Sequence, residues 1–141
     1  MFSTLYRILG NHDDAQDALQ EGFVQVFKRI GDFKKQSTLG AWIKTIMVRQ
    51  AVARLRKKKW LEPVENLPDV AFIPPDDMLG EVIETAILKL PEGCRAVFLL
   101  IEVEGFAHRE VAEMLAISEG TSKSQLFYAK RILRDLLKDE R

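Results

Sequence analysis

One segment in the middle of the chain, residues 60–77, constrains the fold more than any other feature. It is rich in acids and holds four of the five prolines. Proline lacks an amide hydrogen and its ring clashes with the preceding helical turn, so a regular helix cannot continue through closely spaced prolines. We therefore predict two small domains, 1–59 and 78–141, joined by an extended proline-rich acidic linker at 60–77. The prolines are Pro63, Pro68, Pro74 and Pro75.

Apolar residues on both sides of this linker recur every three to four positions, whereas strict alternation does not persist anywhere. That spacing is typical of helices. In the N-terminal domain we expect a helix that closes at Gly10, a second from near His12 to Gly31, and a third capped by Ser37 or Thr38. The second helix carries an apolar set that follows the three-to-four residue spacing. The set is Ala15, Leu19, Phe23, Val26, Phe27 and Ile30.

The C-terminal domain shows four shorter helical patterns. We expect helices at 78–90, from Pro91 to Gly105, at 108–115, and from 119 to about 138. Pro91 suits the first turn of its helix, where an amide hydrogen is not needed. The predicted fold class is therefore all-α, with two small helical domains.

The composition argues against several classes of protein. Cys94 is the only cysteine, so we expect neither a disulfide framework nor a zinc cluster, and we interpret it as a small buried apolar residue. No apolar run approaches the roughly 18–20 residues of a membrane span, and the N-terminus lacks the features of a signal peptide. We expect a cytoplasmic protein without membrane insertion, metal or cofactor.

The formal net charge is zero, but the charges are unevenly distributed. One basic block spans 49–59, another spans 123–138, and acids concentrate between them. Because the local field governs binding to a polyanion, two basic surfaces suit a nucleic acid despite the balanced total. The first block comprises Arg49, Arg54, Arg56, Lys57, Lys58 and Lys59, and the second comprises Lys123, Lys130, Arg131, Arg134 and Lys138.

Residues 108–138 have the pattern of a helix-turn-helix. A short helix ends at Leu115, Ile117 points inward from the turn, and Ser118 can cap a longer helix. On a helical wheel the inward face comprises Ser122, Leu126, Ala129, Leu133 and Leu136. The opposite face comprises Thr121, Ser124, Gln125, Tyr128 and Arg131, flanked by Lys123, Phe127, Lys130 and Arg134. This face suits base edges and phosphates, and a solvated helix of a small bundle fits the periodicity equally well.

The basic block at 49–59 also has two interpretations. Cations near the end of a helix are usually solvated, and they suit the helix dipole. Trp42 and Phe33 lie nearby in the sequence, and aromatic groups beside cations suit unstacked bases. Each aromatic residue taken singly is more often part of a core.

Two sets of motifs resemble conserved regions of RNA polymerase sigma factors of the sigma-70 family. The second region is matched by 14–23 (DAQDALQEGF), by 33–42, and by 54–59 (RLRKKK). The fourth region is matched by Leu90-Pro91, 104–106 (EGF), 112–121 (AEMLAISEGT) and Lys123-Ser124. The order of the regions and the acidic linker resemble the extracytoplasmic-function (ECF) class, which lacks the other regions. The helix-turn-helix also fits response regulators, so both sets together carry the resemblance.

The resemblance implies a protein that catalyses nothing itself and directs bacterial RNA polymerase to promoters. In the family, the second helix docks on the clamp helices of the largest polymerase subunit. The matching residues here are Asp17, Gln20 and Glu21. The resemblance also implies an anti-sigma factor that restrains the free protein.

The resemblance places melted promoter DNA of the minus-ten element on the N-terminal domain. The loop from Phe33 to Thr38 and the start of the following helix would hold the bases, with Trp42 as a wedge at the edge of the duplex. The loop residues concerned are Phe33, Lys34, Lys35 and Ser37, and the residues expected to contact phosphates are Arg49, Arg54, Arg56 and Lys57.

The resemblance places the minus-thirty-five element on the last helix, which would enter the major groove. The matching residues in that helix are Lys123, Ser124, Gln125, Phe127 and Tyr128, with Arg131 on the same predicted face. His108 and Arg109 match positions that touch DNA at the start of the motif.

The sequence departs from the family pattern at three places. It starts at what corresponds to the end of the family's first helix, so we expect an N-terminally shortened region 2 domain. Arg49 and Ala53 stand where the family often has Asn and Asp. In the last helix Ser122 replaces a β-branched apolar residue and Gln125 replaces a frequent Arg. Since Gln pairs with adenine where Arg favours guanine, we expect a shifted promoter preference.

Two other functions stay open at this point. A helix-turn-helix regulator acting without polymerase would explain residues 107–138, and it would bind paired half-sites as a dimer. A helical polymerase-binding adaptor would have basic faces that are merely solvated. An enzyme is not expected, because His12 and His108 are far apart and neither a Gly-rich phosphate loop nor a metal-spaced cluster occurs in the sequence.

Overall fold

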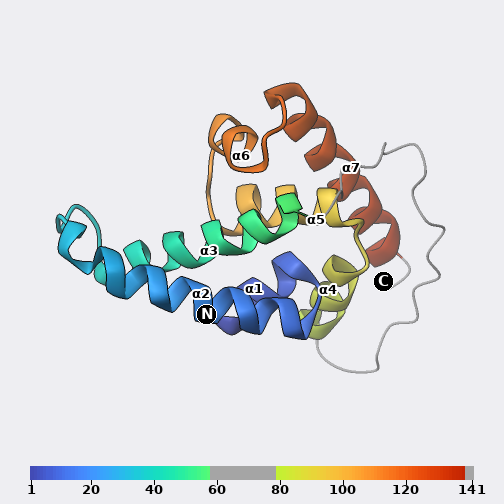
Figure 1. Cartoon of the computed structure of the whole chain (residues 1–141). Coiled ribbons are helices and arrows are strands. Elements are labelled where there is room, and N and C mark those ends of the chain that lie inside the picture. Colours follow the sequence, from blue (N-terminus) through green and yellow to red (C-terminus); the bar gives the residue numbers. More distant parts are fainter. Residues whose placement is uncertain (58–78, 139–141) are drawn as a thin grey trace. The chain divides into compact units, whose positions relative to one another are not determined.

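The computed structural model describes residues 1–57 and 79–138 (Figure 1). The chain divides into two compact units, Met1–Lys59 and Trp60–Arg141. Every regular element of the described residues is a helix, which confirms the predicted all-α class. The predicted linker at 60–77 lies outside the described residues, as do Lys58 and Lys59 of the first basic block.

The N-terminal unit contains the helices α1 (Phe2–Leu9), α2 (His12–Arg29) and α3 (Leu39–Lys57). α1 closes at Gly10, whose φ of 69° lies in the left-handed region and whose amide donates to the Tyr6 carbonyl at 2.6 Å. α2 begins at His12 as predicted, because Oδ1 of Asn11 accepts the amide hydrogen of Asp14 at 3.0 Å.

The connection between α2 and α3 is short and capped. α2 ends before the predicted Gly31, and the chain continues through a 3-10 turn, η1 (Ile30–Asp32). α3 begins after Thr38, whose Oγ1 accepts the Ala41 amide hydrogen at 3.2 Å. Thr38, rather than Ser37, therefore caps α3.

α2 turns a face of small residues toward the core of its unit. The buried residues of this face are Ala15, Ala18, Gly22 and Val26. Gly22 lies so close to Met47 of α3 that a Cβ added there would overlap the methionine sulfur. Phe23, Phe27 and Ile30 are exposed, and Phe27 keeps 77% of its surface accessible. The three-to-four residue spacing of the apolar set therefore fits two different faces of α2, and the small-residue face packs inward because it allows closer helix packing.

The C-terminal unit contains α4 (Leu79–Leu88), α5 (Glu92–Phe98), the π-helical turn η3 (Leu99–Val103), α6 (His108–Leu115) and α7 (Glu119–Lys138). Pro91 directly precedes α5, and Gly105 ends the helical run with a φ of 80°. The four predicted helical segments are therefore present, with the second divided into α5 and η3. No helix of the described residues is long and apolar enough to cross a membrane.

α7 forms the long side of the core of this unit, since it packs against α4, α5 and α6. Cys94 is buried, as predicted. Arg95 is also buried, and its Nη1 donates to the carbonyls of Leu88 and Leu90 at 3.4 Å each. This arginine thus satisfies carbonyl groups at the end of α4, where helices leave acceptors unpaired.

Candidate nucleic-acid interface

α6 and α7 form a helix-turn-helix with a tight connection. Ala116 takes a left-handed conformation with a φ of 55°, and the Ile117 amide donates back to the Ala112 carbonyl at 3.0 Å. Oγ of Ser118 accepts the amide hydrogen of Thr121 at 3.0 Å, which caps α7 as predicted. These bonds set the start of α7 and therefore which of its side chains face outward.

The exposed face of α7 combines polar, aromatic and basic side chains. Ser124, Phe127 and Arg131 lie three and four residues apart, so they share one side of the helix, and Lys123 is exposed beside them. Phe127 is 58% exposed, and its ring meets that of Tyr128 edge to face with centroids 5.7 Å apart. Hydroxyl, aromatic and cationic groups on one helix face are suited to base edges and phosphates in a major groove.

Gln125 does not belong to this face, so its predicted placement there is wrong. Its side chain is only 6% exposed, and its Oε1 accepts the S–H of Cys94 at 2.8 Å. The inward face of α7 passes through Ser122 and Gln125, while Leu126 is half-buried at its edge. Polar partners on neighbouring helices allow both residues to lie in the core. Ser122 was predicted to face inward, whereas the burial of Gln125 was not predicted.

His108 at the start of α6 is one of these partners. Its Nδ1 lies 2.7 Å from the buried hydroxyl of Ser122, and the ring is partly buried. The bond joins α6 to α7. Arg109, the next residue, is exposed.

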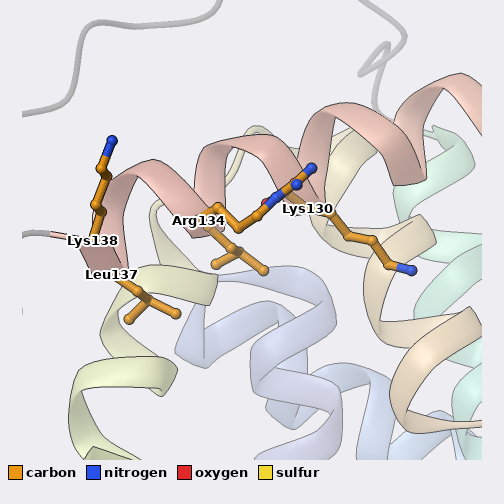
Figure 2. A pocket seen from close by; sticks show the side chains of 5 residues that line it. Lys130, Arg134, Leu137 and Lys138 are labelled. Atoms are coloured by element: carbon orange, nitrogen blue, oxygen red, sulfur yellow. The ribbon is translucent and has the colours of Figure 1, made fainter. Parts of the chain in front are cut away.

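The C-terminal half of α7 carries a mixed apolar and basic surface, which lines a pocket (Figure 2). Its lining residues are Lys130, Leu133, Arg134, Leu137 and Lys138. Nζ of Lys130 forms an ion pair with Oε1 of Glu102 at 2.7 Å. Lys130 is therefore engaged within its own unit.

The N-terminal unit has an aromatic pair beside an exposed basic face. The rings of Phe33 and Trp42 have centroids 5.4 Å apart. Trp42, Arg49 and Arg56 are spaced by seven residues, so they line up along one side of α3. Arg49, Arg56 and Lys57 are exposed, whereas Trp42 is half-buried. The structure thus brings Phe33 and Trp42 into contact and places Arg49 and Arg56 along the same side of α3 as Trp42.

The loop between η1 and α3 presents its polar residues to solvent. Lys34, Lys35 and Ser37 are exposed, and Lys35 has a left-handed φ of 57°. Oγ of Ser37 donates to the Thr38 carbonyl at 3.3 Å. A lysine in this conformation is uncommon and stores a small amount of backbone strain.

Arg54 faces a different way from the other cations of α3. Its Nη1 lies 2.9 Å from Oε1 of Glu21, and its Nη2 lies 3.2 Å from Oδ2 of Asp17. Nη2 also lies 3.9 Å from Oδ1 of Asp14. Arg54 was predicted to contact phosphates, whereas Asp17 and Glu21 were predicted to contact the polymerase. The structure joins these three side chains in one cluster.

Sequence reasoning missed two features of α2. The contribution of Asp14 to the Arg54 cluster follows from the crossing of α2 and α3, which the sequence alone does not specify. The sequence did contain a sign that Phe23, Phe27 and Ile30 form an exposed apolar strip, because α2 also carries a set of small residues that can face the core instead. Gln20, predicted to bind a partner, is exposed on α2.

Comparisons with known proteins identify both units. The model of the Sigma-70 region 2 family matches residues 1–61, and that of the Sigma-70 region 4 family matches residues 80–133. A solved structure of the sigma factor RpoE in complex with the anti-sigma factor NepR from Bartonella quintana supports the fold, with a TM-score of 0.63 at 23% identity. That match covers 99% of this chain and 91% of the RpoE chain.

Curated relatives extend this finding to nearly the whole sequence. The ECF RNA polymerase sigma factor SigW of Bacillus subtilis is 30% identical over 156 residues, covering 99% of this chain and 83% of SigW. SigM of Mycobacterium tuberculosis is 31% identical over 130 residues, covering 89% of this chain. The chain spans 65% of SigM and 57% of SigE of Mycolicibacterium smegmatis, somewhat less than two thirds of either protein. This chain belongs to the extracytoplasmic-function class of RNA polymerase sigma factors in the sigma-70 family.

Proposed function

We propose that this chain directs RNA polymerase to promoters and starts transcription by binding and opening DNA. The observation that carries the proposal is the exposed face of α7, where Lys123, Ser124, Phe127 and Arg131 project from a capped helix-turn-helix. Membership of the ECF class supports RNA polymerase as the partner in this function. In this role the protein supplies specificity, and the polymerase supplies the chemistry.

Recognition of the minus-thirty-five element is the first proposed step. Ser124 and Phe127 would face base edges, because they lie on the outward side of α7 near its first two turns. Lys123, Arg131 and Arg109 would contact phosphates, which position the helix without specifying sequence. His108 and Tyr128 are partly buried, so we assign them to the edges of this surface.

Opening of the minus-ten element is the second proposed step. Bases that leave the stack need aromatic surfaces and nearby cations, at a cost of a few kcal/mol for each base. Phe33 and Trp42 offer such a surface, with Lys34, Lys35 and Ser37 in the adjoining loop. Arg49, Arg56 and Lys57 would hold the phosphates along α3.

Docking on the polymerase would use the outward side of α2. Asp17, Gln20 and Glu21 are exposed there, and Phe27 lies seven residues after Gln20 on the same side. Exposed apolar surface next to charged groups is typical of protein interfaces. We propose that the clamp helices of the largest polymerase subunit bind this surface.

We further propose the division into a region 2 domain at 1–59, a linker at 60–77 and a region 4 domain at 78–141. An anti-sigma factor is proposed as a second partner, since the RpoE neighbour was solved with the anti-sigma factor NepR. A cytoplasmic location follows from the proposed work on DNA with polymerase, and no enzymatic activity is proposed.

The test is in vitro transcription with bacterial core polymerase on a promoter library, with and without this protein. We expect promoter-specific initiation that Lys123→Ala and Phe127→Ala weaken at the minus-thirty-five step. Asp135→Asn, an exposed change on the same helix, serves as the matched control. Gln20→Ala should weaken core binding, with Ser3→Ala at an exposed position of α1 as its control.

The competing functions give different results in the same assay. Core binding without any promoter selectivity would favour a helical adaptor. Specific binding of paired half-sites by a dimer, without core polymerase, would favour a helix-turn-helix regulator. Either result would overturn the sigma-factor proposal.

A further inference from the structure

Arg54 joins α3 to three carboxylates of α2. It lies 2.9 Å from Glu21, 3.2 Å from Asp17 and 3.9 Å from Asp14, measured between guanidinium nitrogen and carboxylate oxygen. These acids are spaced by three and four residues, so they form one row along α2. A guanidinium is planar with several fixed donors, which allows it to bind more than one carboxylate at once.

We propose that Arg54 is a positioning residue that orients Asp17 and Glu21 for binding to the polymerase, and that it does not contact promoter phosphates. This inference rests on the proposed function, because it concerns the same docking surface. It reassigns one cation of the first basic block from DNA binding to protein binding.

The orientation of Arg54 argues against a role at the DNA surface. Arg49 and Arg56 share the exposed side of α3 with Trp42, whereas Arg54 lies on a different side of the helix and meets α2. The Arg54 side chain is 24% exposed, and both of its terminal nitrogens are engaged by acids. Phosphate binding would require these ion pairs to break.

Two of the three carboxylates, those of Asp17 and Glu21, remain available to a partner while Arg54 holds them. Asp17 and Glu21 each use one oxygen in the ion pair, and their side chains stay 58% and 53% exposed. A carboxylate has about four acceptor sites, so a second cation can bind the same group. Ordering these side chains before docking removes part of the entropy that binding would otherwise cost.

Arg54 also limits repulsion within the row. Asp13, Asp14, Asp17 and Glu21 all project from α2, and like charges four residues apart destabilise a helix. One central cation allows three acids to lie close together. The row can therefore present a dense negative surface to a basic partner.

The test compares full-length variants for binding to bacterial core polymerase and to promoter DNA. We expect Arg54→Gln to weaken core affinity about three- to tenfold, as for coupling between neighbouring charged groups. Arg54→Lys should recover only part of the loss, because an ammonium lacks the planar fork. Arg56→Gln is the matched control on the exposed side of α3, and it should change core affinity by less than about twofold.

Binding of the assembled holoenzyme to promoter DNA distinguishes a cation that contacts phosphates from one that positions carboxylates. The logarithm of the binding constant falls linearly with the logarithm of the salt concentration, and loss of one phosphate contact lowers the steepness of this slope, the salt slope, by about one. We expect that decrease for Arg56→Gln and an unchanged slope for Arg54→Gln. A lower slope for Arg54→Gln with unchanged core affinity would overturn the inference.

A double-mutant cycle distinguishes positioning from general stabilisation of the unit. In a Glu21→Gln, Asp17→Asn background the further change Arg54→Gln should cost little core affinity, since its targets are absent. An equal loss in both backgrounds, or a drop in melting temperature with wild-type core affinity, would show a structural role only. Failure of the unaltered protein to bind core would overturn the proposed function, and this inference with it.

Discussion

The thiol of Cys94 on α5 donates a hydrogen bond to Oε1 of Gln125 on α7 at 2.8 Å, and both side chains are buried. The bond ties the middle of α7, the helix proposed to face DNA, to the core of its unit. Gln125 therefore acts on the interior side of α7, where it can influence the angle of the helix but not touch a base.

We predict that Gln125→Arg destabilises the protein instead of changing its base preference. The substitution would bury a cation beside a neutral thiol, which we expect to cost about 3 kcal/mol or more. Gln125→Leu keeps the volume and removes the polar group, so its cost should stay below about 1.5 kcal/mol. Urea denaturation measures both effects. A stable Gln125→Arg protein that selects a different minus-thirty-five sequence would contradict the buried placement.

The Cys94 thiol should lower the free energy of unfolding as the pH becomes alkaline. Burial raises the pKa of Cys94 from 9.0 to about 11, because the thiolate is poorly solvated in the core. The pKa of Cys94 is thus higher in the folded than in the unfolded protein. The contribution of the neutral thiol to the free energy of unfolding is therefore fully present below pH 9 and is lost as the pH rises toward 11. We expect a loss of about 2–3 kcal/mol across this range.

Cys94→Ser provides the comparison for this effect. Its hydroxyl does not titrate in this range, so the stability difference between the two proteins should shrink as the pH rises. The free energy of unfolding is measured by urea denaturation at each pH. A parallel pH dependence for both proteins would rule out the thiol as the cause. Labelling of the native thiol at neutral pH should likewise be slow.

The bond between His108 and Ser122 should stabilise the helix-turn-helix. Ser122→Ala removes the partner of a partly buried ring nitrogen, and we expect a cost of about 1–2 kcal/mol. His108→Ala should cost a similar amount, and the double variant should cost less than the two losses together. A double-mutant cycle in urea measures this coupling. Additive losses would show that the contact contributes nothing specific.

Replacement of Gly22 by a larger residue should destabilise the protein while Met47 is present. A Cβ at Gly22 would overlap the buried Met47 sulfur, so Gly22→Ala should destabilise by about 1–3 kcal/mol despite the higher helix propensity of alanine. The cost should be smaller in a Met47→Ala background, where the space is empty. Thermal or urea unfolding of the four proteins tests this. A stabilised Gly22→Ala protein would contradict the close approach of α2 and α3.

Local signals in the sequence were sufficient to predict most helix ends. Gly10, Thr38 and Ser118 lie at the ends or caps that their residue types favour, because capping depends on neighbouring backbone groups. The helical spacing also predicted the all-α class and the helix-turn-helix. The family followed from two motif sets in order, which depend on residue identity and not on packing.

Only the tertiary structure decided which side of α2 and α7 faces inward, and what Arg54 binds. On α2 two apolar sets have the same spacing, and contact with α3 selects the small residues around Gly22. On α7 the wheel placed Gln125 outward because it is polar, yet Cys94 on another helix gives it a buried partner. Arg54 likewise meets Asp17 and Glu21 across 37 and 33 residues of sequence. Pairings between helices depend on how the helices cross, and that geometry is a property of the packed unit rather than of any one segment.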